Sequence, residues 1–365
     1  MTHPIRLALC TFALIACGQI VAAEPAAADY RRLNLDLVDH HIVPRYARLA
    51  ETTARLEEAA VRHCRALDTE GPAALDTAWR EAFDAWQGVQ HLRFGPGELF
   101  MRGMRMQFWP DPRNTVGRQL DELIAAGDPA VLEAERFKRL SIAVQGFPAI
   151  ERLLADGRAP VGGDYRCAVL EAVAGNVADM AADTLQGWRG GERPYREVVA
   201  EAAKGAAHYQ QDSEVTQALF KSLHGLMELL AEHKLTRPLG DSPQTARPQL
   251  AESWRGKRSL DNLRINLEAA EAMYFGESGG TGFSHFVREV RGDAALDDLL
   301  RRAFAQTRAT AASIALPLEE AVVDPAERRK VTKLVREASA LKALFAQRLT
   351  LALGIPLGFN SLDGD

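Results

Sequence analysis

Apolar residues recur at the three- and four-residue spacing of amphipathic helices along most of the chain, and few segments alternate with the two-residue period of strands. Alanine, leucine, arginine and glutamate dominate the composition, which is typical of an all-α protein. The pattern predicts helices over residues 30–67, 73–92, 114–125, 165–188, 214–232, 259–274, 294–314 and 325–353. We therefore expect an all-α fold made of antiparallel helical bundles.

The length of 365 residues exceeds what one hydrophobic core usually supports, so two domains are expected. Glycines and a proline interrupt the helical pattern at 190–194 and place the boundary there. This divides the chain into an N-terminal bundle at 29–190 and a C-terminal bundle at 205–365, each with about four helices. A short similarity between 147–154 and 223–230 suggests a duplication.

One predicted helix, Arg139–Leu154, carries two residues that do not suit its pattern. Pro148 falls in its interior, where a proline removes a hydrogen bond and crowds the carbonyl of Val144. Glu151 falls about 20° around the helix from the apolar Leu140, so its carboxylate is expected on the buried stripe. A buried carboxylate has to be paired, hydrogen-bonded, protonated or metal-bound.

The duplication makes Glu151 a candidate for function, because its counterpart in the second half is Met227, an ordinary core residue. A structural ion pair is the alternative to a binding-site role. The nearest sources of positive charge for such a pair are Arg93, Arg113 and Arg118.

The predicted loop at 95–113 is long and rich in methionine, glycine and proline, and long ordered loops are often functional. Trp109 and Asp111 are expected to line a pocket there, or to cover the end of the bundle. The thioethers of the loop are soft ligands that suit copper or haem iron, although packing is their commoner role: Met101, Met104 and Met106. Surface or core roles are expected for histidines without a partner at a ligand spacing: His208, His224, His233 and His285.

Residues 1–23 have the features of an export segment. Arg6 precedes an apolar run at 7–16 that is too short to span a membrane. Leu14-Ile15-Ala16-Cys17 resembles a lipobox, which would place a lipid on Cys17, whereas Val21-Ala22-Ala23 suits ordinary cleavage after Ala23. Both alternatives predict a protein of the periplasm or cell envelope, and lipidation of Cys17 would anchor it to a membrane, such as the outer membrane.

Two cysteines, Cys64 and Cys167, remain after the export segment. An even pair in an oxidising compartment predicts a disulfide, with two separate core thiols as the alternative. The formal net charge of −5 is mixed along the chain, and the absence of a basic block argues against a nucleic-acid partner.

The segment Gly146-Phe-Pro-Ala-Ile-Glu151 resembles the Gly-x-His-x-x-Glu signature of the imelysin family, also called peptidase M75, with Pro148 in place of the histidine. Further stretches are similar to the same family: Ala85–Pro96, Trp109-Pro110, Trp254–Tyr274 and Leu357–Asp365. The resemblance covers essentially the whole mature chain. It is closest to a subgroup in which proline is usual at this position.

The resemblance implies two helical bundles, an envelope location and a role in iron or metal uptake, with the site between the bundles. The expected metal is iron or another divalent ion, with Glu151 as a candidate ligand. A metallopeptidase needs about three protein ligands and an open position, and Pro148 supplies no ligand atom. We expect no catalytic residue and the following binding residues: Glu151, Gly146, Pro148, Trp109, Asp111 and Arg93.

Three functions remain in competition at this stage. The first is a non-catalytic envelope protein that binds an iron-containing ligand, or components of iron uptake, between its bundles. The second is a zinc metallopeptidase that uses Glu151, although the chain has no His-Glu-x-x-His motif. The third is a structural scaffold of the envelope. An apolar interface between the bundles, without a polar cavity, would support this function.

Overall fold

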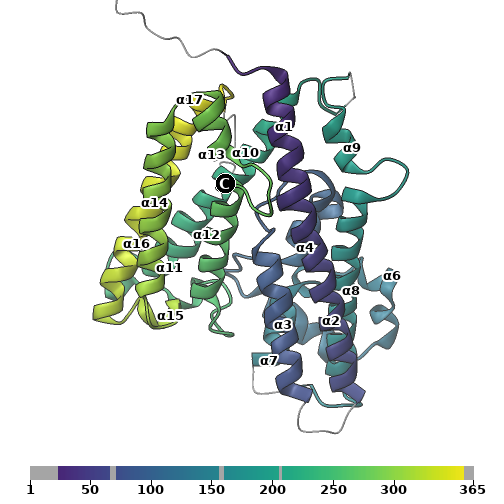
Figure 1. Ribbon diagram of the computed structural model, residues 1–365. Helices are drawn as coiled ribbons and strands as arrows, with labels where there is room; N and C mark the ends of the chain where they lie inside the picture. The colour runs from purple at the N-terminus through teal and green to yellow at the C-terminus, as the bar shows by residue number, and fades with distance from the viewer. Residues whose placement is uncertain (1–23, 66–70, 156–159, 205–207, 357–365) are drawn as a thin grey trace, which may run out of the picture.

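The computed structural model describes residues 24–65, 71–155, 160–204 and 208–356, and every regular element in these ranges is helical (Figure 1). The all-α prediction is confirmed. The longer helices are α1 (Ala27–Leu37), α2 (Val43–Arg65), α3 (Gly71–Gln87), α5 (Thr115–Ala126), α7 (Phe147–Ala155), α8 (Tyr165–Arg189), α10 (Asp212–Glu228), α12 (Ser259–Phe275), α14 (Ala294–Ser313) and α16 (Pro325–Leu344).

Short helical elements connect the longer ones. The short α-helices are α4 (Arg102–Met106), α6 (Ala134–Phe137), α9 (Tyr195–Ala200), α11 (Arg237–Leu239), α13 (Phe283–His285), α15 (Leu318–Ala321) and α17 (Thr350–Leu353). Turns of 3₁₀-helix occur at Gly95–Gly97, Leu99–Met101, Pro129–Leu132, Ile142–Val144, Pro243–Thr245 and Pro248–Leu250. Turns of π-helix occur at Val38–Ile42, Leu229–Thr236, Phe286–Val290 and Phe345–Leu349.

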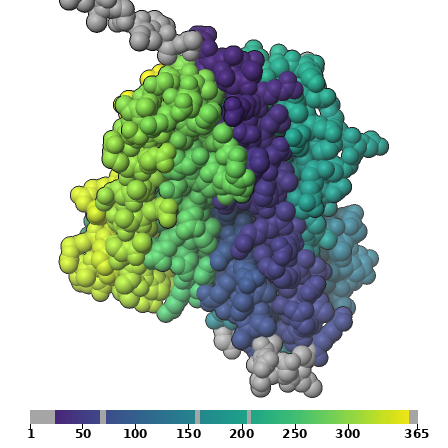
Figure 2. Space-filling model, in the orientation of Figure 1, coloured from purple at the N-terminus to yellow at the C-terminus, as the bar shows by residue number. Residues whose placement is uncertain are grey.

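The helices pack in two groups that lie side by side (Figure 1). In the first group α2 packs against α3 and α8, with α5 and α7 against α8. In the second group α10, α12, α14 and α16 pack together. The groups meet along a continuous surface, where α1 contacts α10 (Figure 2). The division into domains at 190–205 stays a prediction.

Helices α1 and α2 form one rod through the π-helical turn Val38–Ile42, and this rod continues past Pro44. A proline ring crowds the carbonyl four residues earlier, which here belongs to His40. The wider π turn lies at that carbonyl and lets the helix continue past the proline. The predicted end of this helix at residue 67 lies outside the described residues.

The predicted helix over Arg139–Leu154 is wrong. The chain forms α6, a 3₁₀ turn at Ile142–Val144 and then α7, which begins only at Phe147. Pro148 therefore lies in the first turn of α7, where a proline is well tolerated, and not in a helix interior. The apolar spacing across 140–154 reflects burial of separate short elements against one core.

The polar residues at the starts of α5 and α12 do not cap these helices. Asn114 precedes α5, but the side chain that accepts the first N–H groups belongs to Asp111, from Thr115 at 2.7 Å and Val116 at 2.8 Å. Ser259 begins α12, and its hydroxyl donates to the Glu252 carbonyl.

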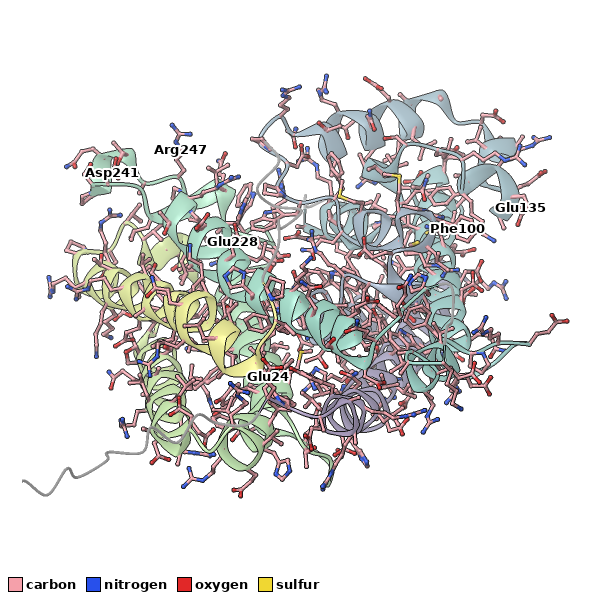
Figure 3. All side chains as sticks on the ribbon, turned by 90° about the horizontal axis from the view of Figure 1, so that it is seen from above. Glu24, Phe100, Glu135, Glu228, Asp241 and Arg247 are labelled. Atoms are coloured by element: carbon pink, nitrogen blue, oxygen red, sulfur yellow. A yellow bond between two sulfur atoms is a disulfide. The ribbon has the colours of Figure 1, made fainter. Side chains whose placement is uncertain are left out.

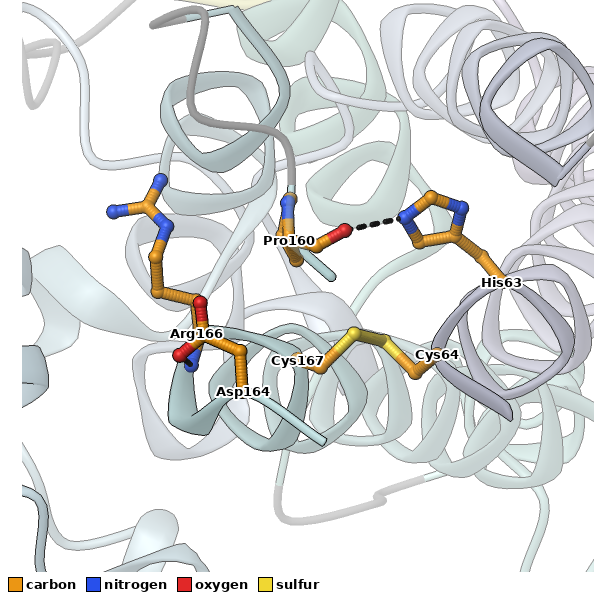
Figure 4. Close-up of a disulfide and its surroundings, with 6 residues drawn as sticks. All are labelled: His63, Cys64, Pro160, Asp164, Arg166 and Cys167. Atoms are coloured by element: carbon orange, nitrogen blue, oxygen red, sulfur yellow. Dashed lines mark hydrogen bonds between the residues drawn. A yellow bond between two sulfur atoms is a disulfide. The ribbon is translucent and has the colours of Figure 1, made fainter. Parts of the chain in front are cut away.

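Cys64 at the end of α2 and Cys167 at the start of α8 form the predicted disulfide (Figure 4). Beside it, His63 Nε2 donates to the Pro160 carbonyl oxygen at 2.8 Å. Because α2 and α8 also pack along their lengths, the bond joins two helices that already form the centre of the first group.

The methionines of the 95–113 loop do not share one environment, since Met106 is buried whereas Met101 and Met104 are exposed. Phe100 projects from the same loop, on the side of the molecule away from Asp241 and Arg247 (Figure 3). This arrangement does not bring the three thioethers into one metal site.

The export segment with Cys17, and the tail from residue 357, lie outside the described residues. Ile355, just before the tail, is buried in the second group. Among the described helices, none has the length and apolar character needed to cross a bilayer.

Candidate functional site

Helix α7 begins where the chain passes very close to α4. A Cβ atom on Gly146 would lie 2.2 Å from the carbonyl oxygens of both Arg105 and Met106, so only glycine fits there. The Gly146 carbonyl accepts the first hydrogen bond of α7 at 3.0 Å. Gly146 was expected among the binding residues. In the structure it allows the close approach to α4 that positions α7.

Gln145 fixes the same turn from inside the first group. Its side-chain oxygen accepts from Arg105 Nε at 2.7 Å, and its side-chain nitrogen donates to the Leu140 carbonyl at 2.6 Å. Its main-chain carbonyl accepts from Asn176 of α8 at 3.0 Å. Because Gln145 is buried, these bonds determine the direction in which α7 leaves the turn.

Glu151 points from α7 towards the second group of helices. Its side chain is 9% exposed, as its helical position predicted, and Oε1 accepts from the Gly256 amide at 2.9 Å. The sequence pointed to Arg93, Arg113 or Arg118 as sources of positive charge, whereas the cation that acts on this carboxylate is Arg255.

Burial raises the pKa of Glu151 to about 7 from its ordinary value of 4.5. The Gly256 amide and the Arg255 charge lower this pKa, and the nearby carboxylates of Glu252 and Glu319 raise it. Desolvation is the largest of these effects, because the charged form loses more hydration than its single amide and the guanidinium restore. Glu151 therefore changes charge near neutral pH.

A cavity of about 370 Å³ lies beside Glu151, between the two groups of helices. The first group contributes the loop before α5 and the start of α7: Gln107, Phe108, Trp109, Pro110, Asp111, Pro112, Asn114, Val116, Gly117, Pro148, Glu151 and Arg152. The second group contributes the segment before α12: Gln249, Leu250, Ala251, Ser253, Trp254 and Arg255. The walls combine indole and phenyl rings with carboxylate, amide and guanidinium groups.

A second cavity of about 320 Å³ lies on the other side of Glu151. Glu151 and Arg255 line both cavities, and the second is completed by Asp76, Trp79, Arg80, Leu154, Ala155, Gly256 and Lys257. The Arg255 guanidinium also lies 4.4 Å from the centre of the Trp254 ring. A carboxylate and a guanidinium thus stand where the two cavities adjoin.

The cavity brings together four of the six expected binding residues, which are Glu151, Pro148, Trp109 and Asp111. The carboxylate oxygens of Asp111 both accept main-chain N–H groups at the start of α5, so this residue shapes the wall. Arg93 lies outside this lining, is exposed, and acts on Glu98, whose pKa its charge lowers against the larger effect of burial.

A buried polar network adjoins the first cavity and joins the two groups. Lys234 Nζ donates to Gln87 of α3 at 2.8 Å, to Glu252 at 2.7 Å and to Asn266 of α12 at 2.6 Å. Glu252 in turn accepts from Gln107, a residue of the cavity wall, at 2.7 Å. Lys234 and Glu252 are each 1% exposed, so the pair is shielded from solvent.

The donor set around Glu151 does not fit a metal ion held by side chains alone. Across the described part of the chain, no three or more His, Cys, Asp or Glu side chains are grouped to hold one. Pro148 offers no donor atom, and Asp111 is committed to main-chain amides. A transition metal bound here would need most of its ligands from a bound molecule.

Comparison with known proteins agrees with this architecture. The family model of imelysin, the peptidase M75 family, matches residues 42–347. The chain belongs to the imelysin family. An imelysin-like protein of Psychrobacter arcticum has the same fold, with a TM-score of 0.77 and 22% identity over 93% of this chain and all of that one. Iron-regulated protein A of Synechococcus elongatus is 25% identical over 83% of this chain and 80% of its own length.

Sequence reasoning expected the site of this imelysin-family protein between the bundles, but it named no residue of the second group. Gly256 contacts Glu151 across 105 positions of sequence, and the Lys234–Glu252 pair gives no periodic signal. The closest clue was the similarity of the stretch beginning at Trp254 to the family, which identified the segment but not the atoms that it presents.

Proposed function

We propose that this imelysin-family protein is a non-catalytic envelope protein of iron acquisition, which binds an iron-containing ligand between its two groups of helices. Glu151 accepts a hydrogen bond from the ligand, and Trp109 and Trp254 pack against its apolar parts. The observation that carries the proposal is the cavity of about 370 Å³ beside Glu151, within the usual range for small-molecule sites.

An iron complex suits this cavity better than a bare ion. The side chains offer too few metal donors, but they offer aromatic faces and several hydrogen-bonding groups, which recognise an organic chelator. Iron is the element named for the relative from Synechococcus elongatus. Components of iron uptake are the partners that such a protein would serve.

The envelope location is part of the same proposal. Residues 1–23 carry the pattern of an export segment, with Cys17 as the lipidation site in one of its two alternatives. The disulfide between Cys64 and Cys167 supports export, since disulfides persist in oxidising compartments.

Titration of the purified mature chain with ferric citrate and with a ferric hydroxamate tests the proposal, with tryptophan fluorescence as the signal. We expect saturable binding of one of them at one molecule per chain. Glu151→Ala should weaken it about tenfold or more, because a hydrogen bond to a charged group contributes about 1.5–3 kcal/mol.

Glu122→Ala, at an exposed position of α5, is the matched control and should bind like the wild type. Growth under iron limitation should distinguish the same variants: cells with Glu151→Ala should grow poorly, and cells with Glu122→Ala should grow like the wild type. Wild-type binding and growth in Glu151→Ala would show that the site is assigned wrongly.

The zinc peptidase and the scaffold make different predictions. A peptidase would hold stoichiometric zinc near Glu151, which elemental analysis of the purified protein measures. A scaffold would need an apolar interface without a polar cavity, whereas the present interface encloses one lined by charged and polar groups.

A further inference from the structure

Two phenols and an imidazole meet at the connection between the two groups of helices. Tyr195 begins α9, and its hydroxyl lies 2.9 Å from the Tyr209 hydroxyl and 3.0 Å from His208 Nε2. The ring centres of His208 and Tyr209 are 4.8 Å apart and nearly perpendicular. The Tyr195 hydroxyl thus lies within hydrogen-bond distance of polar atoms of both His208 and Tyr209.

The Tyr195 ring is held firmly by the first group. It packs edge-on against Trp188, with ring centres 5.1 Å apart, and also contacts Phe94. Gly95 has a φ of +61°, and a Cβ atom there would lie 2.8 Å from the tyrosine ring. The glycine therefore lets the backbone lie directly against this ring, which fixes the position of its hydroxyl.

The separations of these polar atoms match those of neighbouring ligands on a metal ion. Bonds of about 2.1 Å at right angles place two ligand atoms about 3.0 Å apart. Phenolate oxygen is a hard ligand that binds iron in proteins, and imidazole is a common ligand of the same metal. We infer that Tyr195, Tyr209 and His208 form a ferric-ion site, with the remaining positions taken by water or a small anion.

The surroundings favour a cation at this point. The Glu214 carboxylate acts electrostatically on Tyr209, and its negative charge favours a positive ion beside that residue. Each phenol would release its proton on binding, and the iron would stay trivalent. Tyr209 is buried whereas His208 is exposed, which leaves an open side for exchange.

This site is separate from the cavity beside Glu151. Figure 1 places α9 and α7 at opposite ends of the first group of helices. The three residues lie in α9 and just before α10, whereas the cavity is lined by the loops before α5 and α12 and by the start of α7. The two sites can therefore be tested independently.

Addition of ferric nitrilotriacetate to the purified mature chain tests the inference, because a phenolate bound to Fe³⁺ gives a visible charge-transfer band. We expect this band to saturate at one iron per chain. Tyr195→Phe and Tyr209→Phe should each reduce it, and the double variant should abolish it. His208→Gln should shift the band and weaken binding by about tenfold or more, since loss of even an outer partner of a metal has that effect.

Tyr165→Phe is the control, because this tyrosine donates to the Asp128 carbonyl at 2.7 Å, away from the site, and its loss should leave the band unchanged. Glu151→Gln should also leave it unchanged, which separates this site from the proposed ligand cavity. His208 is exposed, so its variant keeps the fold even if a phenylalanine variant does not. The absence of a band in the wild type would overturn the inference. So would a band that survives in the folded double variant, or one that is unaltered in His208→Gln.

Discussion

At the scale of single residues, Glu151 combines burial with an incomplete set of partners. One main-chain amide and the Arg255 charge face a carboxylate that is 9% exposed. Its pKa is about 7 because burial disfavours the charged form more than the amide and the Arg255 charge stabilise it. Protonation would turn the carboxylate from a hydrogen-bond acceptor into a donor, so the charge presented to a ligand depends on pH in the physiological range.

Glu151→Gln should change the pH dependence of stability. A carboxyl whose pKa is higher in the folded than in the unfolded chain costs stability when it ionises. This cost is absent below pH 4.5, grows as the pH rises towards 7 and is constant above that. Urea unfolding measures the difference in the free energy of unfolding between the variant and the wild type. This difference should shift by about 3 kcal/mol in favour of the variant when the pH is raised from 4 to 8. The exposed control Glu122→Gln should show no such gain, and an equal difference at both pH values would contradict the shift.

At the scale of elements, the Lys234–Glu252 pair links α3, the π-helical turn Leu229–Thr236 and α12. Burial lowers the pKa of Lys234, and the Glu252 carboxylate opposes this effect. A buried ion pair stabilises a fold little compared with apolar packing, but removal of one partner leaves an uncompensated charge. The pair therefore makes one arrangement of these elements strongly preferred over others.

Lys234→Met should lower the free energy of unfolding by about 3–5 kcal/mol, because Glu252 would remain buried without its cation. Lys342→Met is the matched control. That lysine pairs with Glu232 of the same π-helical turn at the surface, and its loss should cost less than about 1 kcal/mol. Urea unfolding of both variants measures the difference, and equal losses would refute the role given to Lys234.

The sequence predicted the long helices well, because each of them buries one apolar face over several turns. It also predicted that Glu151 is buried, since the helical spacing from 147 to 155 is real. The helix at 139–154 was wrong because the close contact of Gly146 with α4 is a tertiary constraint without periodicity. The Gly256 amide and the Lys234 network could not be predicted for the same reason, as each depends on residues that only the fold brings together.

At the scale of the whole molecule, the disulfide restricts a large part of the first group of helices. Cys64 and Cys167 are 103 positions apart, and the chain between them includes α3, α5 and α7. The loop that contributes Trp109 to the cavity wall lies within this closed segment. Oxidation of the pair therefore stabilises the half of the molecule that carries Glu151.

Replacement of Cys64 and Cys167 together by serine should lower the free energy of unfolding by about 5 kcal/mol, the loop-closure entropy of a segment of about 100 residues. Urea unfolding of the variant and of the reduced wild type should give similar values. A loss below about 1 kcal/mol would contradict the stabilisation assigned to the closed loop.

The rod formed by α1 and α2 connects the two groups of helices. At about 1.5 Å per residue it is roughly 60 Å long, and it contacts α10 of one group and α3 and α8 of the other. Any displacement of one group relative to the other must therefore bend this rod or disrupt the packing of one of its halves. A single continuous helix thus transmits strain between the two parts of the chain that line the cavity.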